Sequence, residues 1–124
     1  MQKRVLVVDD DAGVRDLLQA ILELEDCEVI LAENGLIALE KLKTVQPDLI
    51  LLDLRMPYMD GFTFAEELQR QGLRSAIPIL ALTADTRTKT RIEQMGFDSY
   101  LTKPFDLHHF LCEITKLMEP IQAY

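Results

Sequence analysis

The 124-residue chain has no tryptophan, few glycines and no apolar run that approaches the roughly 20 residues of a membrane-spanning helix. Its first residues, MQKRVLVVDDD, place four apolar residues before three acids, which is not the pattern of a secretory signal peptide. These absences predict a cytoplasmic protein without a membrane association.

Cysteine is equally scarce. Cys27 and Cys112 are isolated and far apart in the sequence. In a chain without an export signal, such cysteines are typical of small buried hydrophobic side chains. We therefore predict neither a disulfide nor a metal site at these two positions.

Positive charge is also in deficit, because the net charge is −8. A nucleic-acid surface would need a basic stripe, so we expect no direct nucleic-acid binding by this domain. The length fits one domain over residues 1–124, in which 119–124 could begin a linker or form a C-terminal tail.

Short apolar runs alternate with segments of helical periodicity along the whole chain. The predicted strands are Val5–Val8, Cys27–Ala32, Leu49–Leu52, Ile77–Leu82 and Tyr100–Leu101. A helix is predicted after each strand. Continuous apolar strands alternating with helices indicate a parallel sheet covered on both faces. With right-handed crossovers, the expected fold is α/β: a doubly wound five-stranded parallel sheet in the order 2-1-3-4-5, the flavodoxin-like (βα)5 sandwich.

Polar side chains stand directly after the predicted strands. They are Asp9, Asp10 and Asp11 after the first, Glu33 and Asn34 after the second, Asp53 after the third, Thr83 after the fourth, and Lys103 and Pro104 after the fifth. Ligands of such sheets bind at the carboxyl ends of the strands, where the strand order reverses. Strands one and three are neighbours there, so Asp9, Asp10 and Asp53 should converge.

Converging carboxylates repel one another unless a cation holds them. Mg²⁺ suits a site of few carboxylates plus waters and leaves positions for a phosphate oxygen. Thr83 could donate a hydrogen bond to that phosphate, and Lys103 could neutralise it. This set favours phosphoryl transfer, in which a carboxylate can serve as the nucleophile.

Four motifs, VLVVDDD, LILLDLRMPYMDG, ILALTA and SYLTKPF, together resemble the marks of response-regulator receiver domains of two-component signalling. The resemblance covers nearly the whole chain and implies that Asp53 is the phosphoacceptor. It also implies that Asp10, Asp53 and the backbone carbonyl of Arg55 bind Mg²⁺ directly, with Mn²⁺ as a possible substitute, and that Asp9 acts largely through water.

The resemblance further implies that Thr83 and Lys103 contact the phosphoryl oxygens, beside the small Ala84, and that the Lys103–Pro104 bond is cis. Tyr100 matches the family's switch aromatic, which moves inward when the Thr83 loop closes on phosphate. The signal would reach the face of the fourth helix, fifth strand and fifth helix.

The implied partners are a sensor histidine kinase or histidine phosphotransfer protein and a downstream output domain or protein. A monomer or a phosphorylation-dependent dimer is expected. Such a domain is a switch and not a metabolic enzyme, since it catalyses only its own phosphorylation and dephosphorylation. Two alternatives stay open: a Mg²⁺-dependent phosphohydrolase with an aspartyl nucleophile, which usually has an acid where Arg55 stands, and a non-phosphorylated interaction module of the same fold.

One region departs from the family's pattern, and a pair of residues bears on the rate at which phosphate is lost. The polar stretch Arg87–Met95 lies in a segment about two residues shorter than is usual, so we expect the fourth helix to be short, shifted or mobile. Arg55 and Asp85 each lie two residues after a site residue, and we predict that they pair across the pocket and slow the loss of phosphate.

Overall fold

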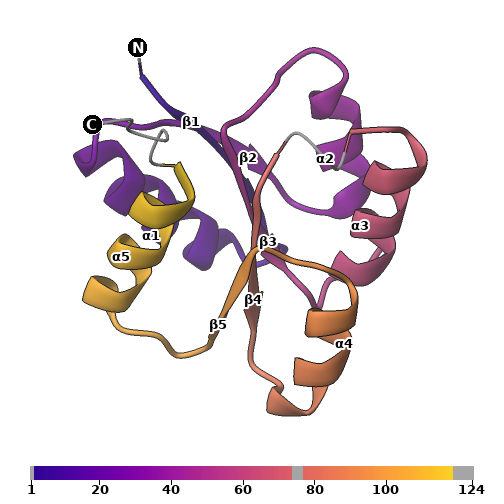
Figure 1. Cartoon of the computed structure of the whole chain (residues 1–124). Helices are drawn as coiled ribbons and strands as arrows, with labels where there is room; N and C mark the ends of the chain where they lie inside the picture. Colours follow the sequence, from indigo (N-terminus) through magenta and orange to yellow (C-terminus); the bar gives the residue numbers. More distant parts are fainter. Residues whose placement is uncertain (1, 74–76, 119–124) are drawn as a thin grey trace, which may run out of the picture.

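The computed structural model describes residues 2–73 and 77–118, so the predicted tail or linker at 119–124 lies outside the described residues. Five parallel strands form one sheet between two layers of helices (Figure 1). The strands are β1 (Arg4–Val8), β2 (Glu28–Ala32), β3 (Leu49–Asp53), β4 (Ile79–Thr83) and β5 (Ser99–Thr102). The helices are α1 (Ala12–Leu24), α2 (Gly35–Leu42), α3 (Gly61–Arg70), α4 (Lys89–Gln94), which follows the 3₁₀ turn η2 (Thr86–Thr88), and α5 (Leu107–Met118).

The strand order is β2-β1-β3-β4-β5, which confirms the predicted doubly wound topology. Every neighbouring pair is parallel, so all five carboxyl ends reach the same edge of the sheet. The registers keep these ends level: Val8 lies opposite both Ala32 and Leu52, and Thr83 lies opposite Thr102.

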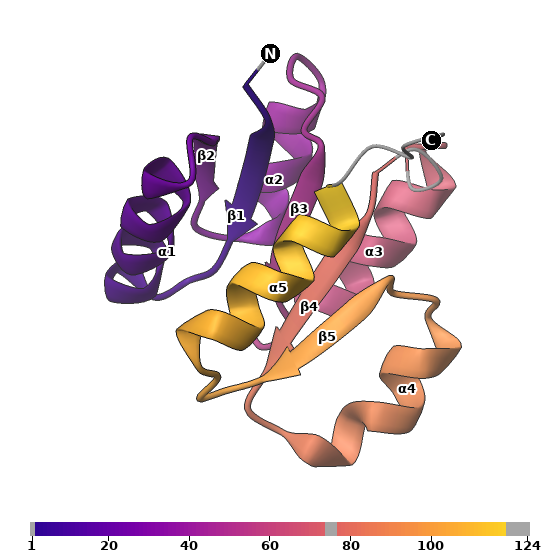
Figure 2. The ribbon, with the colours of Figure 1, turned by 60° about the vertical axis from the view of Figure 1, so that its left-hand side comes forward.

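Alternation along the strands divides the core into two layers, because successive side chains of a strand point to opposite faces. Leu6, Val8, Ile50, Leu52, Ile79 and Ala81 pack with α2, α3 and α4. Val5, Val7, Leu49, Leu51, Leu80 and Leu82 pack with α1 and α5. The two views in Figures 1 and 2 show α1 and α5 on one side of the sheet and α2, α3 and α4 on the other.

Several predicted boundaries move for local reasons. Cys27 lies outside β2 because its N–H still donates to the carbonyl of Leu22 in the last turn of α1. β4 begins at Ile79 and not at Ile77, since Pro78 has no N–H to donate, although its carbonyl accepts from the N–H of Ile50.

The fourth helix is short, as predicted: α4 has six residues, and one 3₁₀ turn precedes it. The prediction that both cysteines are buried is right for Cys27 and wrong for Cys112, which is exposed. On α5 the sheet-facing positions are Phe110 and Ile114. Cys112 lies midway between them, which turns its side chain to the opposite side of the helix. Across the described residues, no helix is long and apolar enough to cross a membrane.

Candidate functional site

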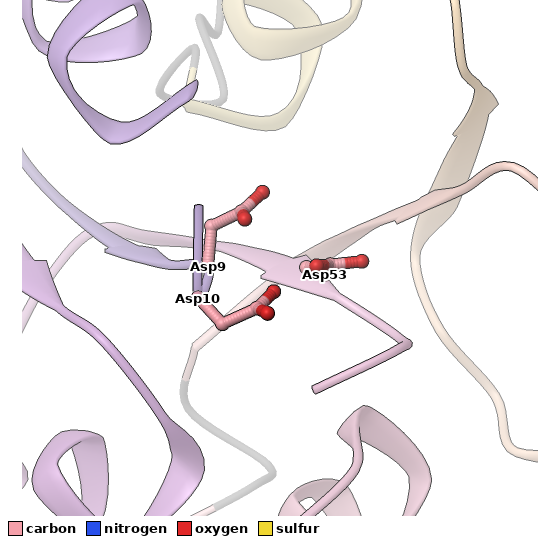
Figure 3. Close-up of side chains that lie close together, drawn as sticks. All are labelled: Asp9, Asp10 and Asp53. Carbon is pink, nitrogen blue, oxygen red and sulfur yellow. The ribbon is translucent and has the colours of Figure 1, made fainter. Parts of the chain in front are cut away.

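Three carboxylates gather at the carboxyl edge of the sheet, where β1 and β3 end side by side (Figure 3). One oxygen each from Asp9, Asp10 and Asp53 lies within 4.8 Å of the others. Asp9 and Asp53 are 1% and 6% exposed, whereas Asp10 is exposed to solvent. The predicted convergence is therefore present, and the cluster opens outward on the side of Asp10.

Backbone contacts hold the first two acids in place. The Asp9 N–H donates to Ala32 at 3.1 Å, and the Asp9 carboxylate accepts from the N–H of Asp11 at 2.9 Å. Asp11 in turn caps α1, because its side chain accepts the N–H groups of Gly13 and Val14. The loop between β1 and α1 is thus pinned at the strand and at the helix.

Lys103 supplies the positive charge of the cluster. Its ammonium nitrogen lies 3.2 Å from an oxygen of Asp9 and 3.7 Å from an oxygen of Asp53. Its backbone N–H donates to the carbonyl of Thr83 at 2.7 Å, which joins the ends of β4 and β5. The Lys103–Pro104 peptide bond is cis, in agreement with the resemblance.

The environment of Asp53 raises the pKa of its carboxyl group when no cation is bound. Burial is the largest cause that raises its pKa from 3.8 to about 7, and repulsion from Asp9 adds to it. The charge of Lys103 and the N–H of Arg55, 3.2 Å from the Asp53 carboxylate, act in the opposite direction. A further cation at this cluster would restore the carboxylate.

The donor set fits Mg²⁺. It consists of carboxylate oxygens, one of them open to solvent, which is the kind of site that this ion occupies while keeping several waters. Arg55 lies next to the acceptor through its N–H contact with Asp53. The direct role of its carbonyl as a ligand stays a prediction.

Thr83 ends β4 beside this cluster and is buried. Its hydroxyl accepts from the N–H of Asp85 at 3.0 Å and donates to the carbonyl of Asp85 at 3.3 Å. Ala84, between them, is exposed. A groove of about 490 Å³ runs from Asp10 and Thr83 towards Arg91 on α4, so the carboxyl edge is accessible from solvent.

The model of the response regulator receiver domain family matches residues 5–115. The chain belongs to this family. Among curated proteins, the receiver domain is 38% identical over 117 residues to the DNA-binding dual master transcriptional regulator RpaA of Synechocystis, a match that covers 93% of this chain and 48% of RpaA. The receiver domain spans about half the length of the curated relatives it matches.

Two solved structures place the receiver domain among known folds. Chemotaxis protein CheY4 of Vibrio cholerae has a TM-score of 0.87 at 31% identity, covering 94% of this chain and 99% of that one. Response regulator TrrA of Thermotoga maritima, in complex with Mg²⁺-BeF, has a TM-score of 0.84 at 34% identity, with the same coverage.

In this receiver domain Tyr100 is half-buried on β5 and packs against the core. A cavity of about 80 Å³ lies between Tyr100 and Thr83 and is also lined by Lys89 and Ile92 of α4. The predicted switch pair is therefore brought to one small space, next to the short helix.

The predicted ion pair between Arg55 and Asp85 is wrong. Asp85 pairs with Arg87 at 2.9 Å, and the backbone N–H of Arg87 donates to the same carboxylate, also at 2.9 Å. These hydrogen bonds lower the pKa of Asp85, and the charge of Arg55 is the weakest contribution. Arg87 prevails because the η2 turn brings both its guanidinium and its N–H to Asp85.

Sequence reasoning missed Arg15, whose guanidinium donates to the carbonyl of Asp9 at 2.7 Å and braces the acidic loop from α1. No motif marks such a contact, since it depends on a side chain reaching back from the helix to a backbone oxygen. The cap at Asp11 carries a recognisable signal, an aspartate immediately before a helix. Asp60 caps α3 in the same way, by accepting the N–H of Thr63.

Proposed function

We propose that this receiver domain is a phosphoryl-accepting switch of a two-component phosphorelay, with Asp53 as the phosphoacceptor. The observation that carries the proposal is the position of Asp53 at the end of the central strand β3, within one cluster with Asp9, Asp10 and Lys103. The donor is a sensor histidine kinase or histidine phosphotransfer protein. Family membership favours a switch over a phosphohydrolase with an external substrate.

The reaction requires the ionised form of Asp53. An Asp53 oxygen forms a bond to phosphorus as the bond between phosphorus and the donor nitrogen breaks, and the electron pair of that bond leaves with the imidazole. Mg²⁺, when bound, would neutralise charge on the carboxylates and on the phosphoryl oxygens. Asp10, Asp53 and the Arg55 carbonyl would hold the ion directly, and Asp9 through water. The complex of TrrA with Mg²⁺-BeF supports the binding of Mg²⁺ by this receiver domain.

Lys103 offsets charge on both sides of the reaction. Before transfer it neutralises Asp9 and Asp53, which lie 3.2 and 3.7 Å from its ammonium nitrogen. After transfer it can turn to a phosphoryl oxygen without leaving the cluster, because its backbone is fixed to β4 at Thr83. Positioning and charge compensation of this kind supply most of the catalysis in phosphoryl transfer.

The readout begins at Thr83. Its hydroxyl can exchange the Asp85 carbonyl for a phosphoryl oxygen, which would pull the loop towards Asp53 and away from Tyr100. The cavity between Thr83 and Tyr100 gives the ring a place to move into. The result is a two-state change of α4, β5 and α5, and a phosphoryl group needs only about 1–3 kcal/mol of coupling to alter partner affinity severalfold.

The output is a further domain or a separate protein. The curated regulators that match this domain are about twice its length, which supports an output domain. RpaA is described as DNA-binding, but the net charge of −8 argues against nucleic-acid contacts by this domain itself. A cytoplasmic location and a monomer or phosphorylation-dependent dimer complete the proposal.

A Mg²⁺ titration followed by amide NMR tests the site. Adding Mg²⁺ should shift the amides of residues 9–11 and 53–55, and beryllofluoride added next should shift Thr83 and Tyr100. Asp10→Asn should weaken Mg²⁺ binding by about tenfold or more, since it removes a carboxylate ligand. Asp11→Asn is the matched control, because asparagine also caps helices, and it should bind normally. Equal weakening in both variants would contradict the assignment.

A further inference from the structure

Helix α5 carries a nitrogen and a sulfur donor one turn apart on its exposed side. The Nε2 atom of His108 lies 3.6 Å from the Sγ atom of Cys112, and both residues are exposed. A spacing of four residues places two side chains on the same face of a helix. The helix itself is fixed, because Phe110 and Ile114 are buried against the sheet.

The separation of these two atoms matches a metal chelate. Zn²⁺ in proteins binds a thiolate sulfur at about 2.3 Å and an imidazole nitrogen at about 2.0–2.1 Å, in tetrahedral geometry. Two such bonds at the tetrahedral angle place the nitrogen and the sulfur about 3.6 Å apart. His108 and Cys112 therefore already have the spacing that one such ion would impose.

We propose that His108 and Cys112 form a second metal site, selective for a borderline-soft divalent ion such as Zn²⁺. The donors differ in kind from those of the acidic cluster, where oxygen ligands favour Mg²⁺. In the metal-free protein the thiol and the imidazole form a weak hydrogen bond whose donor depends on the imidazole tautomer, and metal binding releases the thiol proton. Water fills the two remaining coordination positions. The site stands independently of phosphorylation at Asp53.

The neighbouring side chains do not join this pair. His109 points to the adjacent face and lies 3.6 Å from Glu113. Glu113 also accepts from the Ser99 hydroxyl at 3.0 Å and lies 3.6 Å from Lys116. The same helix thus offers a control histidine, which is also exposed but lies beside a carboxylate.

Cobalt binding provides the test, because Co²⁺ takes tetrahedral zinc sites and a Co²⁺–thiolate bond gives a near-ultraviolet charge-transfer band. The full chain is titrated with Co²⁺ in excess Mg²⁺, which occupies the acidic cluster. We expect a band at one ion per chain that Zn²⁺ abolishes. Cys112→Ser should remove the band. His108→Ala should weaken binding by at least about tenfold, since loss of even an outer-shell partner costs about that much.

Three variants serve as controls. His109→Ala and Asp53→Asn should keep the band. Cys27→Ala should also keep it, because the thiol of Cys27 is buried in the wild-type protein. Circular dichroism checks that each variant is folded, which is expected because His108 and Cys112 are exposed. A wild-type protein without the band, a band that survives in Cys112→Ser, or equal weakening by His108→Ala and His109→Ala would overturn the proposal.

Discussion

The ammonium nitrogen of Lys103 lies 3.2 Å from a carboxylate oxygen of Asp9, a contact that joins residues 94 positions apart in the sequence. Asp9 is almost fully buried, and a buried carboxylate is costly unless a charge or hydrogen bonds compensate it. The pair therefore joins the ends of the first strand, β1, and the last strand, β5, at the acidic cluster.

Replacement of Lys103 by methionine should raise the pKa of Asp53 above its value of about 7, because the lysine charge lowers that pKa. NMR titration of the Asp53 carboxyl carbon in metal-free protein measures it. Lys43→Met is the control, since Lys43 is an exposed lysine that pairs with Glu40 far from the cluster. An Asp53 pKa that is equal in wild type and Lys103→Met would contradict the electrostatic role of Lys103.

Asp53 should make metal-free stability depend on pH. Its folded pKa of about 7 lies above its ordinary 3.8, so the folded state holds more protons between these values. The free energy of unfolding therefore falls as pH rises from about 4 to about 7. Asp53→Asn removes this loss, which is up to about 4 kcal/mol. Its melting temperature should exceed that of wild type at pH 8 and match it near pH 3.5. A gain that persists at low pH would have another cause.

The strand order and the acidic cluster could be predicted from sequence because both follow from local patterns. Apolar runs mark buried parallel strands, and topology alone brings Asp9, Asp10 and Asp53 together. Contacts of long, exposed side chains do not follow from such patterns. Asp85 pairs with Arg87 and not with Arg55, because the 3₁₀ turn η2 brings the Arg87 side chain to it. Arg15 of α1 reaches back to the backbone carbonyl of Asp9.

Cys112 shows the same limit. An isolated free cysteine is most often buried, and this holds for Cys27. The position of Cys112 depends on the rotation of α5, which is decided by Phe110 and Ile114. Composition does not contain that information, although helical periodicity around these two residues does.

The charges at the rim of the groove should set the lifetime of the phosphoryl group. Replacing both Arg55 and Asp85 by alanine should speed its loss, because both side chains line the groove and their removal gives water easier access to the phosphoryl group. Arg87→Ala should slow the loss, since it frees Asp85 to pair with Arg55. Decay of phosphorylated protein after removal of the donor measures both. Equal decay in all three proteins would reject the proposal.

Phe62 of α3 should hold the short helix α4 in place. The guanidinium carbon of Arg91 lies 3.9 Å from the centre of its ring, and the ring of Phe97 lies 6.0 Å away. Phe62→Leu should accelerate amide hydrogen exchange in α4 about two- to fivefold. This factor corresponds to the loss of about 0.5–1 kcal/mol, the free energy of an exposed cation–π contact. Phe64→Leu is the matched control, since Phe64 is buried in the same core layer.

In wild type, the amides of α4 should already exchange faster than those of β3 and β4, because only Ile92 anchors the helix as a buried residue. Phe64→Leu should lower global stability, because it removes buried carbon atoms and leaves a cavity, without a selective effect on α4. Strong protection across Arg87–Met95, equal to that of the central strands, would contradict the expected weakness of this helix.

The central claim is that Asp53 accepts a phosphoryl group in a Mg²⁺-dependent reaction. Intact-mass spectrometry after incubation with an acyl phosphate and Mg²⁺ tests it most directly. We predict one added phosphoryl group in wild type and in Asp11→Asn, none in Asp53→Asn, and none in wild type when a chelator removes Mg²⁺. Unlabelled wild type, or label that persists in Asp53→Asn, would contradict the account.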